Sequence, residues 1–165
     1  RMQAVLEYSA MAQFNTKEEF MEGNLFDFIE EYAMNILNRS DRLKVQVVRS
    51  DTEGIEMKFV PQNIAIILDN VVSNSTKYNA NELRVLLGKD EKQYTIDFID
   101  DGDGVSSDIA DLNELFEFGT GYTLTGTGVG LYHIKDIVEK DLQGTVTIES
   151  EPQKGFALHV RFGKV

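Results

Sequence analysis

Cysteine is absent from the 165 residues, and basic residues are scarce relative to acidic ones. Without cysteine the chain has no disulfide framework, no thiolate metal site and no cysteine nucleophile. The 16 Lys and Arg residues against 28 Asp and Glu residues give a net charge of −12, which argues against a protein whose main task is to neutralise nucleic-acid phosphates. A site for one nucleotide is not excluded, because such a site is local.

Long apolar runs are also missing. The longest, residues 64–68, ends at Asp69, far short of the ~20 residues that span a bilayer, and no signal peptide is present. A chain of 165 residues with 42% hydrophobic and 27% charged residues is typical of one soluble globular domain. The chain begins with Arg1 rather than methionine, so we expect a piece of a longer protein.

The hydrophobic patterns predict an α+β fold. Apolar residues at helical spacing predict helices over residues 25–37, 61–78 and 129–140. Shorter β-like runs predict the following strands: 45–48, 55–59, 83–87, 94–99, 145–150 and 156–162. Because most strands follow one another as hairpins, we expect a two-layer α/β sandwich whose mixed, mostly antiparallel sheet is covered on one face by helices. Residues 1–24 are interpreted as a helix end followed by a polar connector.

The second predicted helix carries a polar group beside its apolar stripe. Asn70, Asn74 and Lys77 fall within about 60° of one another on the helix surface, next to an inward stripe that includes Val71 and Ser75. Amide oxygens are hard ligands that suit Mg²⁺, and a Lys ammonium can neutralise phosphate charge. A solvated polar flank of an amphipathic helix is the alternative interpretation of this segment on its own.

An acidic, glycine-containing turn follows the strand at 94–99, reading Asp100-Asp101-Gly102-Asp103-Gly104-Val105. Glycines spaced by one residue let the backbone turn tightly and approach a ligand, and a carboxylate at a strand end can accept a hydrogen bond from an exocyclic amine. The run does not match the EF-hand calcium loop. A plain connecting turn remains the alternative.

A glycine-rich segment, Gly126-Thr127-Gly128-Val129-Gly130-Leu131, opens the third predicted helix. Glycines before a helix expose its free N–H groups, where an anion is favoured. A Rossmann site requires a preceding strand and a Walker loop requires Gly-Lys-Ser/Thr, and neither is present. Each of the three motifs is weak alone, but their order and spacing together are specific.

The three motifs resemble the asparagine box and two glycine boxes of the ATPase superfamily that contains histidine kinases, DNA gyrase, Hsp90 and MutL (GHKL). Leu115-Phe116-Glu117-Phe118-Gly119 resembles the phenylalanine box in the lid of histidine kinases. Ser150-Glu151-Pro152 with Lys154-Gly155 resembles the strand and turn that close this fold. The resemblance covers residues 25–165 and implies the Bergerat ATP-binding fold, with ATP and Mg²⁺ as ligands.

The resemblance also implies a role for each matching position. Asn74 is implied as the principal Mg²⁺ ligand with Asn70 assisting, and Lys77 as a phosphate contact; these three are the implied catalytic residues. Tyr78 is implied to pack on adenine, and Asp100 to accept a hydrogen bond from its amine. The other implied ATP-binding residues shape the adenine pocket or hold the phosphates: Gly102, Gly104, Val105, Phe116, Gly126, Thr127, Gly128, Val129, Gly130 and Leu131.

The residue at the position of Asn70 distinguishes the subfamilies of this ATPase superfamily. Clamp ATPases and anti-sigma-factor serine kinases carry a general-base Glu at this position, whereas histidine kinases commonly carry Asn. An amide cannot take a proton from water or serine, but a neutral imidazole is already nucleophilic and needs less help. Asn70 therefore favours a histidine kinase over a hydrolase.

Two positions depart from the family pattern. Residues 108–125, the implied lid, contain no Lys or Arg, which leaves Lys77 as the one nearby cation that the motifs supply. Phe156 follows Gly155 where the family often has Thr, so a polar contact at the adenine edge is lost.

The phosphoacceptor histidine of a histidine kinase is not expected within the chain. Neither His133 nor His159 lies in a suitable preceding helix; residues 1–24 are interpreted as the end of the dimerisation and phosphotransfer hairpin with its linker, and 25–165 as the catalytic domain. We therefore expect the cytoplasmic kinase domain of a bacterial two-component sensor, either membrane-bound or not. Its expected partners are its own dimerisation domain and a response regulator, with no nucleic acid. The piece itself is expected to be a monomer with little autophosphorylation. A non-catalytic nucleotide-sensing module and a clamp ATPase remain alternatives.

Overall fold

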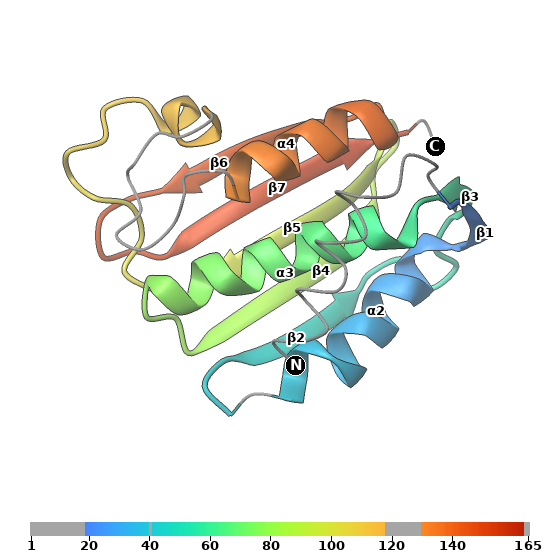
Figure 1. Cartoon of the computed structure of the whole chain (residues 1–165), viewed down its shortest axis with the longest axis horizontal. Coiled ribbons are helices and arrows are strands. Elements are labelled where there is room, and N and C mark those ends of the chain that lie inside the picture. The colour runs from blue at the N-terminus through green and yellow to red at the C-terminus, as the bar shows by residue number, and fades with distance from the viewer. Residues whose placement is uncertain (1–18, 40, 118–129, 164–165) are drawn as a thin grey trace.

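The computed structural model describes residues 19–39, 41–117 and 130–163. Five strands form the main sheet in the order β2-β4-β5-β7-β6, and two more form a small separate sheet. Helices α2, α3 and α4 lie together on one face of the main sheet (Figure 1). The elements, in chain order, are β1 (Met21–Asn24), α2 (Leu25–Asn35), η1 (Leu37–Arg39), β2 (Lys44–Arg49), β3 (Glu56–Phe59), α3 (Pro61–Lys77), β4 (Glu82–Lys89), β5 (Tyr94–Asp100), η2 (Leu112–Phe116), α4 (Gly130–Asp141), β6 (Thr145–Ser150) and β7 (Phe156–Phe162). The predicted α+β two-layer sandwich is confirmed.

Local sequence explains where the first two α-helices begin. Asn24 caps α2, because its Oδ1 accepts a hydrogen bond from the backbone N–H of Asp27 at 3.1 Å. Pro61 occupies the first turn of α3, where its missing N–H costs nothing. Each helix then turns an apolar stripe towards the sheet, and fully buried residues such as Phe26, Leu68 and Ile134 form the core between the two layers.

The main sheet is mixed, as expected, but its pairing differs from the predicted hairpins at one place. β2 pairs in parallel with β4, whereas β4, β5, β7 and β6 pair antiparallel in that order. The expected hairpin between residues 45–48 and 55–59 is wrong, because β3 pairs with β1 instead. Alternation in β2 buries Val45, and pairing with β4 places this residue in the core. Gly54, at φ +74°, lies in the segment that carries the chain away to the second sheet.

Strand β1 lies in the segment that was interpreted as a polar connector. Its sequence, MEGN, has one large apolar residue and no alternation over enough positions to indicate a strand. It forms only because β3 offers a pairing edge, from Met21 opposite Phe59 to Asn24 opposite Glu56. The connector interpretation is therefore corrected at residues 21–24.

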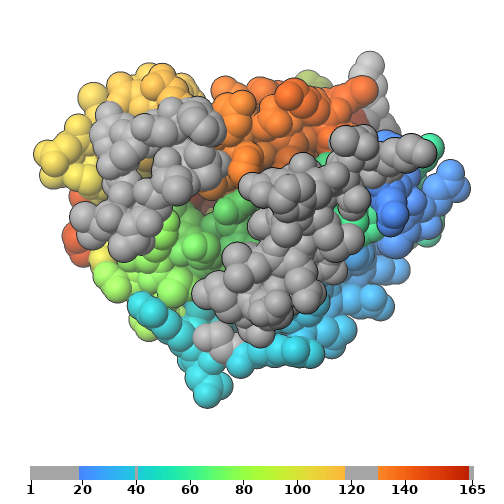
Figure 2. All heavy atoms as spheres, in the orientation of Figure 1, coloured from blue at the N-terminus to red at the C-terminus, as the bar shows by residue number. Residues whose placement is uncertain are grey.

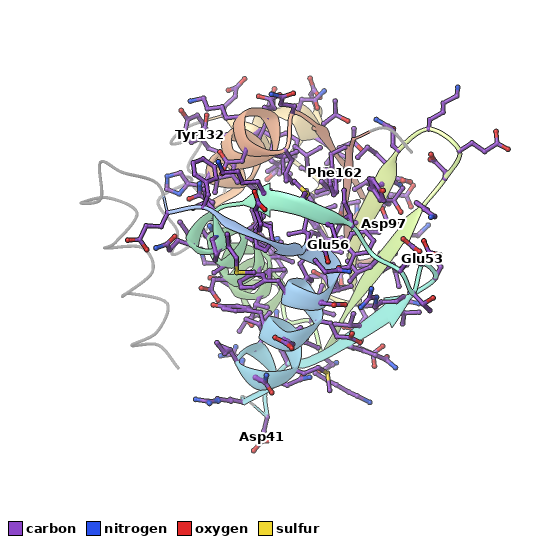
Figure 3. The ribbon with its side chains drawn as sticks, turned by 90° about the vertical axis from the view of Figure 1, so that its right-hand side faces the viewer. Asp41, Glu53, Glu56, Asp97, Tyr132 and Phe162 are labelled. Atoms are coloured by element: carbon purple, nitrogen blue, oxygen red, sulfur yellow. The ribbon has the colours of Figure 1, made fainter. Side chains whose placement is uncertain are left out.

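The helix layer and the sheet layer are seen separately when the molecule is viewed from the side. Figure 3 shows the helices as one layer, with Tyr132 among them, and the strands as the other, with Asp97. In Figure 2, α3 lies between α4 and α2 on the helix face. Residues on the core side of the strands, such as Phe98 and Leu158, are buried, whereas their neighbours Asp97 and His159 face the other side and are only partly buried. No helix in the described ranges is long and apolar enough to cross a bilayer.

Candidate functional site

A small hollow lies between α3, the start of α4 and the core side of the sheet. Its cavity volume is about 10 Å³, room for about one water molecule. Six of its lining residues are apolar and three are polar. The lining residues are Val71, Asn74, Ser75, Leu83, Phe98, Asp100, Leu131, Phe156 and Leu158. An apolar hollow with a few convergent polar groups is typical of a small-molecule site, and we call this hollow the pocket.

Asp100 supplies the carboxylate of the pocket. It is the last residue of β5 and only 7% exposed. Its Oδ2 accepts a hydrogen bond from the hydroxyl of Ser75 at 2.7 Å, and its Oδ1 accepts one from the backbone N–H of Gly102 at 3.0 Å. Both oxygens thus have a donor, as a buried carboxylate requires. Each retains room for one more hydrogen bond.

The turn after Asp100 is fixed against the C-terminal end of α3. The backbone N–H of Asp103 donates to the carbonyl oxygen of Tyr78 at 2.7 Å, and the side-chain amide of Asn79 donates to Oδ2 of Asp103 at 2.7 Å. Gly102 is required here, because a Cβ at this position would lie 2.6 Å from the carbonyl oxygen of Tyr78. The asparagine-bearing helix and the Asp100 turn are therefore held in one arrangement.

The turn between β6 and β7 supports the Asp100 turn from the other side. The hydroxyl of Ser150 donates to the carbonyl oxygen of Gly155 at 2.6 Å and accepts from the backbone N–H of Val105 at 3.1 Å. Gly104 has φ +74°, and a Cβ there would overlap the carbonyl oxygen of Glu151. The predicted contribution of Gly104 is thus conformational: it allows the turn to pack closely.

Asn70 and Asn74 of α3 lie beside the start of α4. Asn74 lines the pocket, and a Cβ on Gly130 would lie 3.3 Å from Oδ1 of Asn70. The absence of a side chain at Gly130 therefore leaves the amide oxygen of Asn70 unobstructed next to the first turn of α4. Because unpaired N–H groups and the helix dipole favour anions at such a turn, this end of the site suits phosphate.

Asp69 directly precedes Asn70 but belongs to the core. It is 7% exposed, and both of its carboxylate oxygens accept from the hydroxyl of Tyr32 in α2 at 3.0 Å. This carboxylate therefore faces α2, and among the residues that the structure describes Asp100 is the carboxylate that lines the pocket.

Four further predicted residues are described by the structure but do not line the pocket. Lys77 is exposed in the last turn of α3, and Tyr78 is half-buried at the helix end, where burial raises the pKa of its phenol. Val105 is partly buried and packs against the core. Phe116 is only 4% exposed and packs in the core.

Phe116 has a cation beside it that the motifs did not reveal. The ammonium of Lys135, on α4, lies 5.5 Å from the centre of the Phe116 ring, within the range of a cation–π contact. Lys135 therefore places a cation next to Phe116, within the segment that the resemblance implies as the lid. The sequence did not predict this contact, because positions 116 and 135 are far apart in the chain.

The remaining predicted residues divide into those that the structure describes and those that it does not. Leu131 lines the pocket and Gly130 borders it. Gly126, Thr127, Gly128 and Val129 lie outside the described residues. Sequence reasoning did not assign Ser75 to the site, although a lone hydroxyl within an apolar stripe was a usable signal. It also missed the apolar walls, which come from residues far apart in sequence: Val71, Leu83, Phe98 and Leu158.

Metal binding at this site would rely on amide oxygens. Within residues 19–39, 41–117 and 130–163, no three His, Asp or Glu side chains gather in a way that could hold a metal ion. Asn70 and Asn74 offer hard oxygen donors beside the phosphate-favouring end, and two such donors fit Mg²⁺, which keeps several waters.

Comparison with known proteins identifies a family. Residues 59–164 match the family described as histidine kinase-, DNA gyrase B-, and HSP90-like ATPase. The chain is 27% identical over 165 residues to the sensor protein kinase PilS of Pseudomonas aeruginosa, an alignment that covers 96% of this chain and 30% of PilS. The chain spans about a third of the length of the curated relatives that it matches.

Solved structures support the fold. The catalytic domain of the histidine kinase ThkA superposes with a TM-score of 0.70 at 19% identity, covering 88% of this chain and 96% of that one. The ATP-binding domain of PrrB from Mycobacterium tuberculosis gives a TM-score of 0.67 at 19% identity, covering 90% of this chain and 99% of that one. At such identities the likeness establishes the fold.

Proposed function

Because the chain belongs to the histidine kinase-, DNA gyrase B- and HSP90-like ATPase family, we propose that it binds ATP with Mg²⁺ and transfers the γ-phosphoryl group to a histidine of another domain. The observation that carries the proposal is the position of Asp100. Its buried carboxylate, at the end of β5, lines a mostly apolar pocket that Asn74 of α3 and Leu131 of α4 also line.

The base of ATP fits the chemistry of the sheet side. Apolar walls from β4, β5 and β7 suit a flat, largely apolar ring. Asp100 can accept a hydrogen bond from the amine of adenine, because each of its oxygens already holds one donor and retains acceptor capacity. Phe156, which lies opposite Asp100 in the β5–β7 register, contributes an apolar wall here, so Asp100 carries the polar recognition.

The phosphates of ATP fit the helix side. We assign them to the first turn of α4, with Lys77 as a nearby cation, and Mg²⁺ to the amide oxygens of Asn74 and Asn70. When bound, Mg²⁺ would neutralise charge on the phosphate oxygens. The protein's own part is to orient the γ-phosphoryl group, which is most of what phosphoryl transfer requires.

The choice of acceptor follows from the side chains next to the proposed phosphate end: with Asp100 assigned to the base, the described part of the chain offers no free carboxylate on α3 there. Hydrolysis needs a group that takes a proton from water; Asn70 cannot do so, and the carboxylate of Asp69 is occupied with Tyr32. A neutral imidazole attacks without prior deprotonation. In the proposed step a ring nitrogen forms the N–P bond as the bond to ADP oxygen breaks, and the imidazole proton is then lost to solvent.

We place this acceptor histidine outside the chain. The Nδ1 atom of His159 is hydrogen-bonded to Asp97 at 2.6 Å, and Glu149 lies 2.8 Å from its Nε2, so this ring lies between carboxylates on the far side of the sheet. His133 is exposed on α4 and is not on a preceding hairpin. The proposed setting is a two-component sensor in the cytoplasm, with a dimerisation domain and a response regulator as partners and with the chain itself monomeric.

The test combines the chain with the phosphoacceptor domain of its full-length protein and ATP labelled at the γ-phosphate. We expect acid-labile, base-stable label on the acceptor, its loss in Asn74→Ala, and its retention in His133→Gln. ATP binding without transfer would instead indicate a nucleotide-sensing module. Steady ATP hydrolysis by the isolated chain would indicate a clamp-type ATPase.

A further inference from the structure

Ser75 is an unusual member of the inward face of α3. It is 1% exposed, and it lies in a helix whose other buried residues are mostly aliphatic. A serine hydroxyl in such surroundings is costly unless it is hydrogen-bonded. An alanine would satisfy the packing and avoid this cost, so the hydroxyl needs an explanation.

The hydroxyl is committed to Asp100. It donates to Oδ2 of Asp100 at 2.7 Å, while the backbone N–H of Gly102 donates to Oδ1 at 3.0 Å. A serine hydroxyl has one proton, so Ser75 acts on Asp100 as a donor. Two donors from different elements, α3 and the turn after β5, determine the rotation of the carboxylate plane.

The rotation of this plane decides which atom of a ligand the carboxylate meets. Within the described ranges, Asn74, Ser75 and Asp100 are the polar residues that line the pocket, and the other lining residues are apolar. A base in this hollow therefore finds one carboxylate with acceptor capacity and little else to orient it. Small rotations of that carboxylate would misalign a hydrogen bond and weaken it.

We propose that Ser75 is a positioning residue that sets the base selectivity of the pocket, by holding Asp100 in the orientation that accepts a hydrogen bond from a 6-amino group. This inference rests on the proposed nucleotide binding. A purine with a carbonyl at C6 presents an acceptor to an acceptor, which is unfavourable. Discrimination between amine and carbonyl depends on a fixed carboxylate, and in Ser75→Ala one of its two donors is gone.

The experiment compares two nucleotides on three proteins. ATP and inosine triphosphate, which carries a carbonyl in place of the 6-amino group, are titrated calorimetrically with Mg²⁺ into the 165-residue chain, Ser75→Ala and Ser73→Ala. Ser73 lies on the same helix but is exposed, so its substitution makes the same chemical change away from Asp100. The measured quantity is the ratio of the two dissociation constants.

We expect wild type and Ser73→Ala to share one preference for ATP. In Ser75→Ala this preference falls about tenfold, the loss expected for one well-oriented hydrogen bond, with weaker ATP binding and little change for inosine triphosphate. Partial unfolding of the variant lowers both apparent affinities by the same factor, so the ratio remains informative even if Ser75→Ala is less stable.

Three results overturn the inference. An unchanged ratio in Ser75→Ala, or equal losses for both nucleotides, would reduce Ser75 to a packing residue while nucleotide binding itself stands. An equal loss of preference in Ser73→Ala would show that the effect does not act through Asp100. Failure of wild type to bind either nucleotide would overturn the proposed function as well.

Discussion

Single residues hold the turn at 100–104 in place, and two of them make separate, measurable contributions. Gly104 supplies a backbone conformation, with φ +74°, that side-chain-bearing residues rarely adopt. Asp101 supplies an acceptor, because its Oδ1 receives the backbone N–H groups of Asn81 at 2.8 Å and Glu82 at 3.0 Å. Both act on the backbone around the pocket.

Replacing Gly104 with alanine should destabilise the fold by about 3 kcal/mol, because the left-handed conformation is strained and the new Cβ overlaps the carbonyl oxygen of Glu151. Urea unfolding measures the effect. Gly23→Ala is the control, since the new Cβ meets only the flexible end of Met21, at 3.2 Å, and a change within about 0.5 kcal/mol is expected. Equal effects at the two positions would contradict this account of the turn.

Asp101 should contribute a pH-dependent part of the stability. Hydrogen bonds from the backbone N–H of Glu82 and, less strongly, of Asn81 lower the pKa of Asp101 below its ordinary value. A carboxyl whose pKa is lowered in the folded state stabilises the fold above its unfolded pKa, near about 4. That stabilisation is lost as the pH falls through the folded pKa.

Asp101→Asn should therefore be less stable than wild type at pH 7, with a difference that shrinks as the pH is lowered below about 4. The amide oxygen of asparagine can still accept from the two N–H groups, so the turn is retained. Chemical denaturation across pH 3 to 7 measures the difference. A constant difference over that range would show that the carboxylate charge has no role.

The burial of Ser75 was predicted from the sequence, but its contribution to the pocket was not. Ser75 was recognised as part of the inward stripe of its helix, and that placement is confirmed. Its bond to Asp100 was not predicted, because the two residues are 25 positions apart and only the packing of α3 on β5 brings them together. Asp100 itself was predicted, because a carboxylate at a strand end followed by two glycines is visible in the sequence.

At the scale of elements, hydrogen bonds connect three segments around the pocket. These segments are the end of α3, the turn after Asp100 and the turn between β6 and β7. The end of α3 holds the Asp100 turn through Asp103, and the β6–β7 turn holds it through Ser150 and Gly155. Ser150 links both sides, because its hydroxyl donates to one turn and accepts from the other. The pocket is therefore preorganised by hydrogen bonds between elements.

Removing this link with Ser150→Ala should destabilise the fold by about 1–2 kcal/mol, because the N–H of Val105 and the carbonyl of Gly155 both lose a partner. Thr147→Val, on the exposed side of the same strand, removes a hydroxyl while keeping the side-chain shape. We expect it to change stability by less than about 0.5 kcal/mol. Thermal and urea unfolding measure both, and similar values for the two would argue against the link.

Element positions were largely predictable, and strand pairing was not. β6 and β7 occur at their predicted bounds, α3 ends one residue before its predicted end, and α4 ends one residue after its predicted end. Local periodicity carries this information. The parallel pairing of β2 with β4, and the pairing of β1 with β3, depend on which strand edges the packed helices leave available. Short polar strands such as β1 carry no local signal of their own.

At the scale of the whole molecule, the helix layer and the sheet layer both contribute groups to the pocket. The helix layer supplies amides, a helix start and nearby lysines, and the sheet layer supplies apolar walls and Asp100. The net charge of −12 repels free anions in general, so nucleotide affinity must come from these local groups, and it should depend on Mg²⁺, which offsets the phosphate charge.

The most direct test is calorimetric titration of ATP into the 165-residue chain with and without Mg²⁺. We predict one saturable, Mg²⁺-dependent site with micromolar to millimolar affinity, loss of the Mg²⁺-dependent binding in Asn74→Ala, and weakening by about 10- to 100-fold in Asp100→Asn. Glu91→Gln, in the turn at the opposite end of β5, should bind as wild type does. Absence of ATP binding by wild type, or wild-type affinity in Asp100→Asn, would contradict the account.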